Sequence, residues 1–121
     1  MNVDNTEELK IISLCTGYGG LDEGIRRAVY PQQLREIVTV EIEAFNIANL
    51  VQKMEVGEMV SCPVWTDLKT FDGERFRGKV HGITGGYPCQ PFSHAGVRKG
   101  KDDPRHLWPY ISEIINTVRP L

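Results

Sequence analysis

The opening of the chain constrains its fold more than any other stretch. A short apolar run, Lys10-Ile11-Ile12-Ser13-Leu14-Cys15, breaks at the glycine-rich segment Thr16-Gly17-Tyr18-Gly19-Gly20. Apolar residues then recur at helical spacing, until a proline closes the pattern at Pro31: Leu21, Ile25, Ala28 and Val29. A strand, a glycine turn and a helix in this order begin a βαβ unit of the mononucleotide-binding type. The sequence therefore favours a parallel α/β sheet whose first turn lets a ligand approach the backbone closely.

The same alternation of strand-like and helix-like segments continues toward the C-terminus. Apolar runs predict further strands at Glu36–Ile42, at Val64–Leu68 and at residues 79–84. Helical spacing predicts a second helix around Phe45–Val51 and a last helix with Asp103 as N-cap and Pro104 at its first position. The apolar stripe of the last helix is typical of a core face: Leu107, Tyr110, Ile111, Ile114, Ile115 and Val118. We predict an α/β fold with a parallel, doubly wound sheet over residues 10–121, after a flexible tail at residues 1–9.

Composition and charge indicate the class of protein and the cellular environment that fit this domain. The chain has 121 residues and a formal net charge of −2, which fits one globular domain and gives no overall basic signature of nucleic-acid binding. We expect no membrane span, because no apolar run approaches about 18 residues, and no signal peptide, because the N-terminus is acidic. Three cysteines without C-x-x-C spacing, and three histidines without ligand pairing, predict a reducing, cytoplasmic setting and no metal site.

A second glycine-containing loop follows the fourth predicted strand and carries a cysteine. In Gly85-Gly86-Tyr87-Pro88-Cys89-Gln90-Pro91-Phe92-Ser93, two glycines give the backbone torsional freedom and two prolines restrict it again. The result is a stiff loop with Cys89 at its tip, at the end of a strand where α/β sheets place ligands and chemistry. Cys89 is therefore a candidate nucleophile, because a thiolate attacks electron-poor carbon well. The alternative is a small buried hydrophobic residue, which is what most free cysteines are.

Acidic residues at strand ends favour a nucleoside ligand. Glu41 ends the second predicted strand 21 residues after Gly20, where a carboxylate can bond both hydroxyls of an adenosine ribose. The alternative for Glu41 is an ordinary exposed acid. Asp67 could reach an adenine amino group by the same geometry. Asp22 and Glu23 suit the helix dipole but would repel a pyrophosphate, and the third glycine of G-x-G-x-x-G is missing. These features favour S-adenosylmethionine over a nicotinamide dinucleotide.

Several segments together resemble motifs of the DNA cytosine-5 methyltransferases. Four of them match the family's first four motifs in order and spacing: Leu14–Leu21, Val40–Ile42, Thr66–Leu68 and Gly86–Ser93. Asp103–Trp108 is similar to the fifth motif. The resemblance implies a Rossmann-like, S-adenosylmethionine-dependent methyltransferase fold and an enzyme that flips a cytosine out of double-stranded DNA. Cys89 would attack carbon 6 of that ring, and carbon 5 would then receive the methyl group of S-adenosylmethionine.

The resemblance also implies roles for the other site residues. The first turn would line the methionine end of the cofactor: Thr16, Gly17, Tyr18, Gly19, Gly20 and Leu21. Glu41 would hold the ribose, Asp67 the adenine amino group, and the adenine ring would pack on Ile42 and Leu68. Pro88 and Leu107 would complete the cofactor-binding set. DNA contacts would come from Gln90, Ser93, Arg98 and Lys99, although the basic cluster around Arg98 also fits a solvated loop.

Two departures from the family pattern concern the cofactor pocket. Cys15 stands where the family usually has an aromatic residue near adenine, so that wall must be built otherwise. Ile42 stands where many members have a tryptophan, and an aliphatic side chain can substitute there.

A third departure concerns length. The chain reaches Leu121 where the family would enter its fifth strand, so we expect a sheet truncated after about four strands. The leading hypothesis is an N-terminal part of a cytosine-5 methyltransferase that is inactive alone: either a truncated reading frame, or one part of a split enzyme completed by a C-terminal polypeptide. The alternative is a non-catalytic cofactor- or DNA-binding accessory protein. A thiol hydrolase is less favoured, because His94 is the one candidate base near Cys89.

Overall fold

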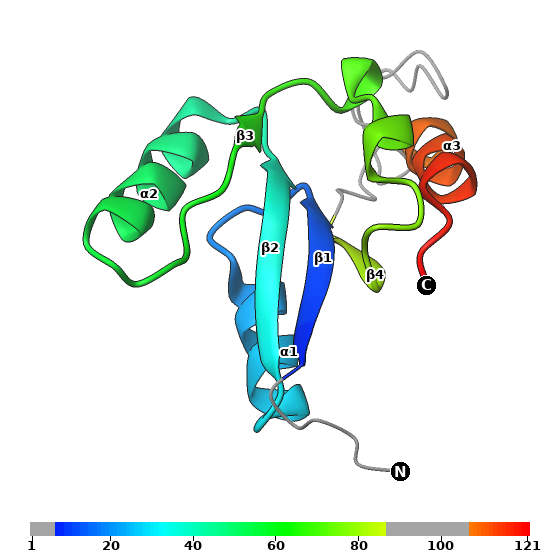
Figure 1. The fold of residues 1–121 in the computed structure, drawn as a ribbon. Helices are drawn as coiled ribbons and strands as arrows, with labels where there is room; N and C mark the ends of the chain where they lie inside the picture. The colour runs from blue at the N-terminus through cyan, green and yellow to red at the C-terminus, as the bar shows by residue number, and fades with distance from the viewer. Residues whose placement is uncertain (1–6, 87–106) are drawn as a thin grey trace, which may run out of the picture.

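A computed structural model of the chain describes residues 7–86 and 107–121 as an α/β fold (Figure 1). The elements follow in this order: β1 (Glu8–Leu14), α1 (Gly20–Val29), β2 (Gln33–Val40), α2 (Ala44–Glu55), β3 (Val64–Trp65), the 3₁₀ helices η1 (Leu68–Thr70) and η2 (Gly73–Phe76), β4 (Gly82–Gly85) and α3 (Trp108–Val118). Strands thus alternate with helical segments, as predicted. None of the helices in these ranges is long and apolar enough to span a membrane.

The sheet is parallel, with strand order β3-β2-β1-β4. From β1 the chain moves outward to β2 and β3 and then returns to add β4 on the other side of β1. Figure 1 shows α2 beyond the β3 end of this order and α3, with the 3₁₀ helices, beyond the β4 end. The two faces also carry different helices, because α3 packs against Ile12 and Leu14 of β1, whereas Asp22 of α1 bonds to Ser13 on the opposite face. This arrangement confirms the doubly wound α/β prediction. It also places a topological switch point between β1 and β4, which is where such sheets bind their ligands.

The apolar core lies on the α3 side of the sheet. Ile12 and Leu14 of β1, Val38 and Val40 of β2, and three residues of α3 form one buried cluster there. The α3 residues are Ile111, Ile114 and Val118, which belong to the stripe predicted from the sequence. The opposite side is more polar, because it carries the buried residues Ser13, Glu36 and Thr39, and α1 bonds to the first two through Asp22 and Arg26. One face of the sheet therefore provides most of the hydrophobic stabilisation, and the other provides hydrogen bonds.

A β-bulge in β2 changes the face to which its later side chains point. Ile11 pairs with Glu36 and Ile12 with Val38, so Ile37 is an extra residue on β2. In a regular strand Glu36 and Val38, two positions apart, would point to the same face, because side chains alternate along a strand; the bulge places them on opposite faces. The bulge turns Val38 and Val40 into the core while Glu36 stays on the α1 side, bonded to Arg26 at 2.6 Å.

Several predicted boundaries were wrong. β1 begins at Glu8, inside the predicted tail, because Glu8 and Leu9 pair with Gln33 and Leu34. Residues 69–78, for which we predicted neither a strand nor a helix, form most of η1 and η2, and these pack against α3. The last helix begins at Trp108 rather than Pro104, with Leu107 as its N-cap. Asp103 and Pro104 themselves lie outside the described residues.

Strand ends also shift. β2 ends at Val40, β3 is confined to Val64–Trp65, and β4 starts at Gly82. Glu41 and Asp67 therefore follow their strands instead of belonging to them, which frees their side chains from strand alternation. Both residues keep the place predicted for them, at the carboxyl edge of the sheet.

Candidate functional site

The carboxyl ends of all four strands meet at one edge of the sheet. The Thr16 N–H donates to the Val40 carbonyl at 3.3 Å, and the Glu41 N–H donates to the Trp65 carbonyl at 2.9 Å. On the other side of β1, the Gly86 N–H donates to the Leu14 carbonyl at 3.3 Å. The segments that follow β1, β2, β3 and β4 are thereby neighbours. The structure brings together the predicted turn, the two predicted acids and the start of the predicted cysteine loop.

The glycine turn between β1 and α1 has a tight backbone. The Gly19 N–H donates to the Thr16 carbonyl at 2.9 Å, which closes a four-residue turn. Gly17 and Gly19 have φ angles of +59° and +84°, a region that glycine adopts without a steric penalty. Cys15, just before the turn, also has a positive φ of +51°, which is uncommon for a residue with a side chain. These torsions turn the chain sharply out of β1 and into α1.

Glu41 holds this turn from the end of β2. Its side chain is buried, with 6% of the residue exposed. One carboxylate oxygen accepts the Gly17 N–H at 2.7 Å, and the other accepts the Glu43 N–H at 2.8 Å. Glu43 is the N-cap of α2, so one carboxylate connects the glycine turn with the start of the second helix. The alternative of an ordinary exposed acid was wrong.

Asp22 forms a second buried carboxylate site, at the switch point. It lies in the first turn of α1 and is 3% exposed. Its two oxygens accept the hydroxyl of Ser13 in β1 at 2.6 Å and the hydroxyl of Thr84 in β4 at 2.7 Å. The Ser13 hydroxyl is also 2.9 Å from the Thr16 hydroxyl, which begins the glycine turn. Asp22 thus links α1, β1, β4 and the turn, a role beyond balancing the helix dipole.

Helix α2 contacts the glycine turn from outside. The Lys53 ammonium donates to the Tyr18 carbonyl at 2.5 Å. The Tyr18 ring meets the ring of Phe45 edge to face, with centroids 6.1 Å apart. Sequence motifs did not identify either α2 residue, since neither belongs to the matched segments.

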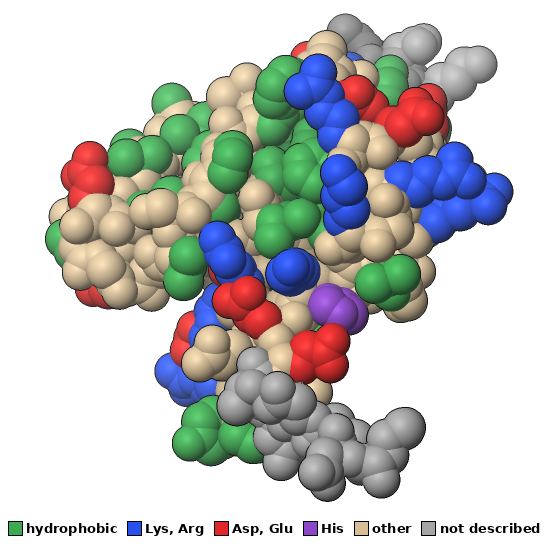
Figure 2. All heavy atoms as spheres, in the orientation of Figure 1, with side chains coloured by type: hydrophobic (Ala, Val, Ile, Leu, Met, Phe, Trp, Pro, Cys, Tyr) green, Lys and Arg blue, Asp and Glu red, His purple; other side chains and the backbone are tan. Residues whose placement is uncertain are grey.

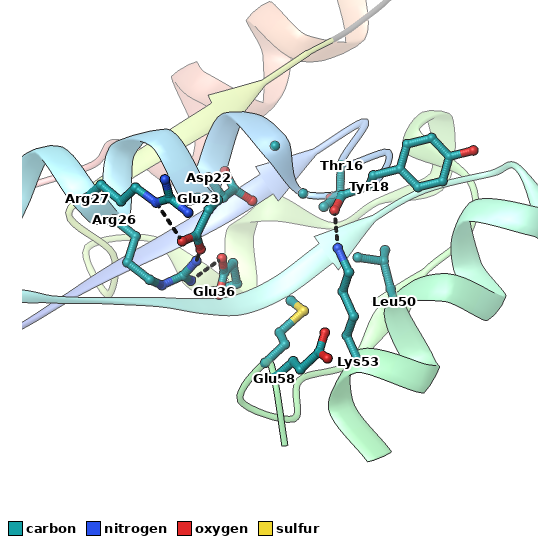
Figure 3. Close-up of a pocket in the computed structure, with 13 residues that line it drawn as sticks. Thr16, Tyr18, Asp22, Glu23, Arg26, Arg27, Glu36, Leu50, Lys53 and Glu58 are labelled. Atoms are coloured by element: carbon teal, nitrogen blue, oxygen red, sulfur yellow. Dashed lines mark hydrogen bonds and ion pairs between the residues drawn. The ribbon is translucent and has the colours of Figure 1, made fainter. Parts of the chain in front are cut away.

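A cavity of about 320 Å³ lies beside the turn, between α1 and α2 (Figure 3). Thr16, Tyr18, Gly19 and Gly20 line it from the turn, and Lys53 crosses it from α2. Its other walls carry charged pairs, such as Arg26 with Glu36. Glu41, Ile42, Asp67 and Leu68 do not line it. The predicted ribose and adenine residues therefore follow the strand ends, whereas this cavity lies on the helix side of the turn.

The segment after β3 is ordered by its own hydrogen bonds. Asp67 caps η1, because its Oδ1 accepts the Lys69 N–H at 2.9 Å. The indole N–H of Trp65 donates to the Asp67 carbonyl at 2.9 Å. Leu68 points into the core and is 7% exposed, which leaves it little side-chain surface for a ligand. Leu107 is half-buried and packs against the same core.

Exposed apolar side chains gather near this edge. Ile42 is 68% exposed and Phe45 72% exposed, and Tyr18, Leu21 and Trp65 are also exposed. In Figure 2 hydrophobic side chains collect in the upper half of the visible face, over the ends of β2 and β3. Solvated apolar surface beside polar groups is typical of a binding site.

The two described cysteines are poor nucleophiles at neutral pH. Burial raises the pKa of Cys15 to about 11, and the nearby Glu41 carboxylate adds to this effect. Burial likewise raises the pKa of Cys62 to about 11. The predicted nucleophile, Cys89, lies outside the described residues, as do five other predicted site residues: Pro88, Gln90, Ser93, Arg98 and Lys99. The described residues hold no group of three or more side chains suited to binding a metal ion.

Replacing Asp22 tests the buried network. Asp22→Ala removes the acceptor of the buried Ser13 hydroxyl and of Thr84, so we expect the free energy of unfolding to fall by about 1–3 kcal/mol. Glu23→Ala is the matched control, because Glu23 pairs with Arg26 and Arg27 at the surface and its loss should lower the free energy of unfolding much less than Asp22→Ala does. Urea unfolding followed by circular dichroism measures both variants. Equal midpoints for the two would contradict the assignment.

The cysteine pKa values predict a pH-dependent reactivity. At pH 8 a thiol with a pKa of about 11 is ionised in about one molecule in a thousand, so Cys15 and Cys62 should react slowly with iodoacetamide. In a Cys89→Ala variant we expect the labelling rate to rise about tenfold per pH unit above pH 8. Mass spectrometry of the alkylated chain follows both sites, with the urea-unfolded chain as the reactive control. Rapid labelling of the folded variant at pH 8 would refute this.

Comparison with known proteins gives a consistent result. A family model described as C-5 cytosine-specific DNA methylase matches residues 9–121. The Type II methyltransferase M.NgoMIV of Neisseria gonorrhoeae is 33% identical over 113 residues, which cover 90% of this chain and 32% of that protein. M.PspPI of a Psychrobacter species is 30% identical over 125 residues, with 99% and 27% covered, and M.NaeI of Lentzea aerocolonigenes is 28% identical over 114 residues, with 94% and 26% covered. The chain spans between a quarter and a third of the length of these relatives.

Proposed function

Because the chain belongs to the C-5 cytosine-specific DNA methylase family, we propose that it forms the cofactor-binding and nucleophile-bearing part of an enzyme acting on DNA. The reaction is transfer of a methyl group from S-adenosylmethionine to carbon 5 of cytosine. The observation that carries the proposal is the edge of the sheet where the glycine turn, Glu41 and the end of β4 converge at a switch point. The family motifs that lie beyond the matched part of its relatives would complete the active enzyme.

The residues at this edge fit an adenosyl cofactor. Glu41 uses its two oxygens for backbone N–H groups, but a carboxylate has about four acceptor sites, so ribose hydroxyls can still bind. Asp67 has Oδ1 engaged by Lys69 and can offer its second oxygen to an adenine amino group. Ile42 and Phe45 supply exposed apolar surface for the adenine ring, in place of the aromatic residue missing at Cys15.

Charge favours a sulfonium over a phosphate cofactor. Asp22 and Glu23 lie in the first turn of α1, where a pyrophosphate would otherwise bind, and Glu41 lies on the other side of the glycine turn. The buried carboxylates of Asp22 and Glu41 disfavour an anionic group beside the turn and stabilise a cation, whereas the charge of Glu23 is balanced by Arg26 and Arg27. S-adenosylmethionine is such a cation, because its electrophilic methyl group is attached to a positively charged sulfonium.

Cys89 is the proposed nucleophile on the DNA side. Its thiolate adds to carbon 6 of the flipped cytosine, which makes carbon 5 electron-rich and able to accept the methyl group. Loss of the proton from carbon 5 then restores the double bond between carbons 5 and 6 and expels the thiolate. Pro88 would contact the base or the cofactor near this centre, and Gln90, Ser93, Arg98 and Lys99 would contact DNA.

Covalent trapping tests this role of Cys89. Duplex DNA with 5-fluorocytosine at every cytosine needs no knowledge of the target sequence, and fluorine at carbon 5 blocks the proton loss that releases the enzyme. We expect the chain with S-adenosylmethionine to form a complex with this DNA that survives denaturing electrophoresis. Even a slow reaction accumulates the trapped product, because trapping is irreversible.

The control for this experiment is Cys89→Ser, which should form no complex, whereas Cys62→Ser should behave like the unaltered chain. A complex that persists in Cys89→Ser would show that another group reacts. No complex after prolonged incubation, with a folded chain, would favour a non-catalytic binding role.

A further inference from the structure

Lys53 makes a long-range contact with the glycine turn that no sequence motif predicts. Its half-buried side chain leaves α2 and crosses the cavity toward the turn (Figure 3). The ammonium donates to the Tyr18 carbonyl at an Nζ–O distance of 2.5 Å, although the two residues are 35 positions apart. A charged donor on a backbone carbonyl forms a stronger hydrogen bond than a neutral one.

This contact fixes one peptide plane of the turn. The peptide unit between Tyr18 and Gly19 is planar and trans, so its C=O and N–H point in opposite directions. The C=O accepts from Lys53, and the Gly19 N–H donates to the Thr16 carbonyl at 2.9 Å. Both ends of the plane are therefore held, and the plane cannot rotate without breaking a hydrogen bond.

Packing alone does not hold the turn. Apart from residues adjacent in the chain or on the same helix, no described heavy atom lies within 4 Å of the position that a Cβ would occupy at Gly17, Gly19 or Gly20. Glycine backbones rotate easily when no side chain wedges them, because both signs of φ are open to them. Apart from the contact of the Tyr18 ring with Phe45, the turn is held by hydrogen bonds: Glu41 on the Gly17 N–H, Thr16 on the Gly19 N–H, and Lys53 on the Tyr18 carbonyl.

We propose that Lys53 is a positioning residue that locks the glycine turn in the conformation that receives the methionine end of the cofactor. This inference rests on the proposed function for the identity of the ligand, but not for the contact itself. Lys53 lies on the helix side of the turn and acts through the backbone of Tyr18 and Gly19. Glu41 and Lys53, with opposite charges, hold successive parts of the same turn.

Amide hydrogen exchange tests the lock without any ligand. Lys53→Met keeps the apolar stem but removes the ammonium, so the Gly19 amide should exchange about tenfold faster by NMR. Lys53→Arg retains a charged donor and should restore protection to within about threefold. Lys79→Met, an exposed lysine before β4, should leave Gly19 unchanged. Unchanged Gly19 exchange in Lys53→Met would overturn the proposal.

Calorimetry with two ligands tests the consequence for binding. S-adenosylhomocysteine carries the amino-acid end of the cofactor, whereas 5′-methylthioadenosine lacks it. Lys53→Met should weaken the binding of S-adenosylhomocysteine about tenfold, or ~1.4 kcal/mol, and leave the affinity for 5′-methylthioadenosine unchanged. Equal weakening of both ligands, or of neither, would contradict a positioning role. If the unaltered chain binds neither ligand, the proposed function fails, and the Gly19 exchange rate still decides the role of Lys53.

Discussion

The two hydrogen bonds of the Glu41 carboxylate are the interaction on which the rest of the site depends. They join the Gly17 amide, in the turn after β1, to the Glu43 amide, at the start of α2. Helix α2 in turn sends Lys53 back to the Tyr18 carbonyl. The turn and the helix thus hold each other through two charged side chains. Burial of Glu41 strengthens these bonds, because fewer water molecules compete for the carboxylate.

The division of the sheet into an apolar and a polar face explains how this edge is supported. On the apolar face, α3 and the 3₁₀ helices bury Ile12, Leu14, Val38 and Val40. On the polar face, Asp22 bonds Ser13 and Thr84, which fixes α1 against β1 and β4. Removing one partner from such a buried network is costly, because the groups left behind are buried and can bond neither to the protein nor to water. The strand ends therefore keep their relative positions while the loops beyond them carry the site.

The sequence predicted the strands and helices that have a periodic apolar pattern, and it did not predict the individual side-chain contacts that leave no such pattern. Hydrophobic spacing correctly indicated four parallel strands and most of the α3 stripe, although Ile115 of that stripe is exposed. Motif spacing placed Glu41 and Asp67 at the carboxyl edge of the sheet. The bulge at Ile37 was not predicted, because one extra residue changes the face to which the following side chains point without changing the apolar content of β2. The burial of Asp22 was not predicted, because the helix dipole is enough to explain an acid in the first turn of a helix. The contact of Lys53 with Tyr18 left no periodic trace over 35 residues.

A crystal structure of the chain with S-adenosylhomocysteine is the most direct test of the central claim that Glu41 joins the glycine turn to the cofactor. The account predicts ribose hydroxyls within hydrogen-bond distance of the Glu41 carboxylate, with the Gly17 N–H still bonded to it. Adenine should lie between the side chains that follow β2 and β3, near Ile42 and Asp67. A ligand seated in the cavity between α1 and α2, or a Glu41 side chain turned away from Gly17, would contradict the account.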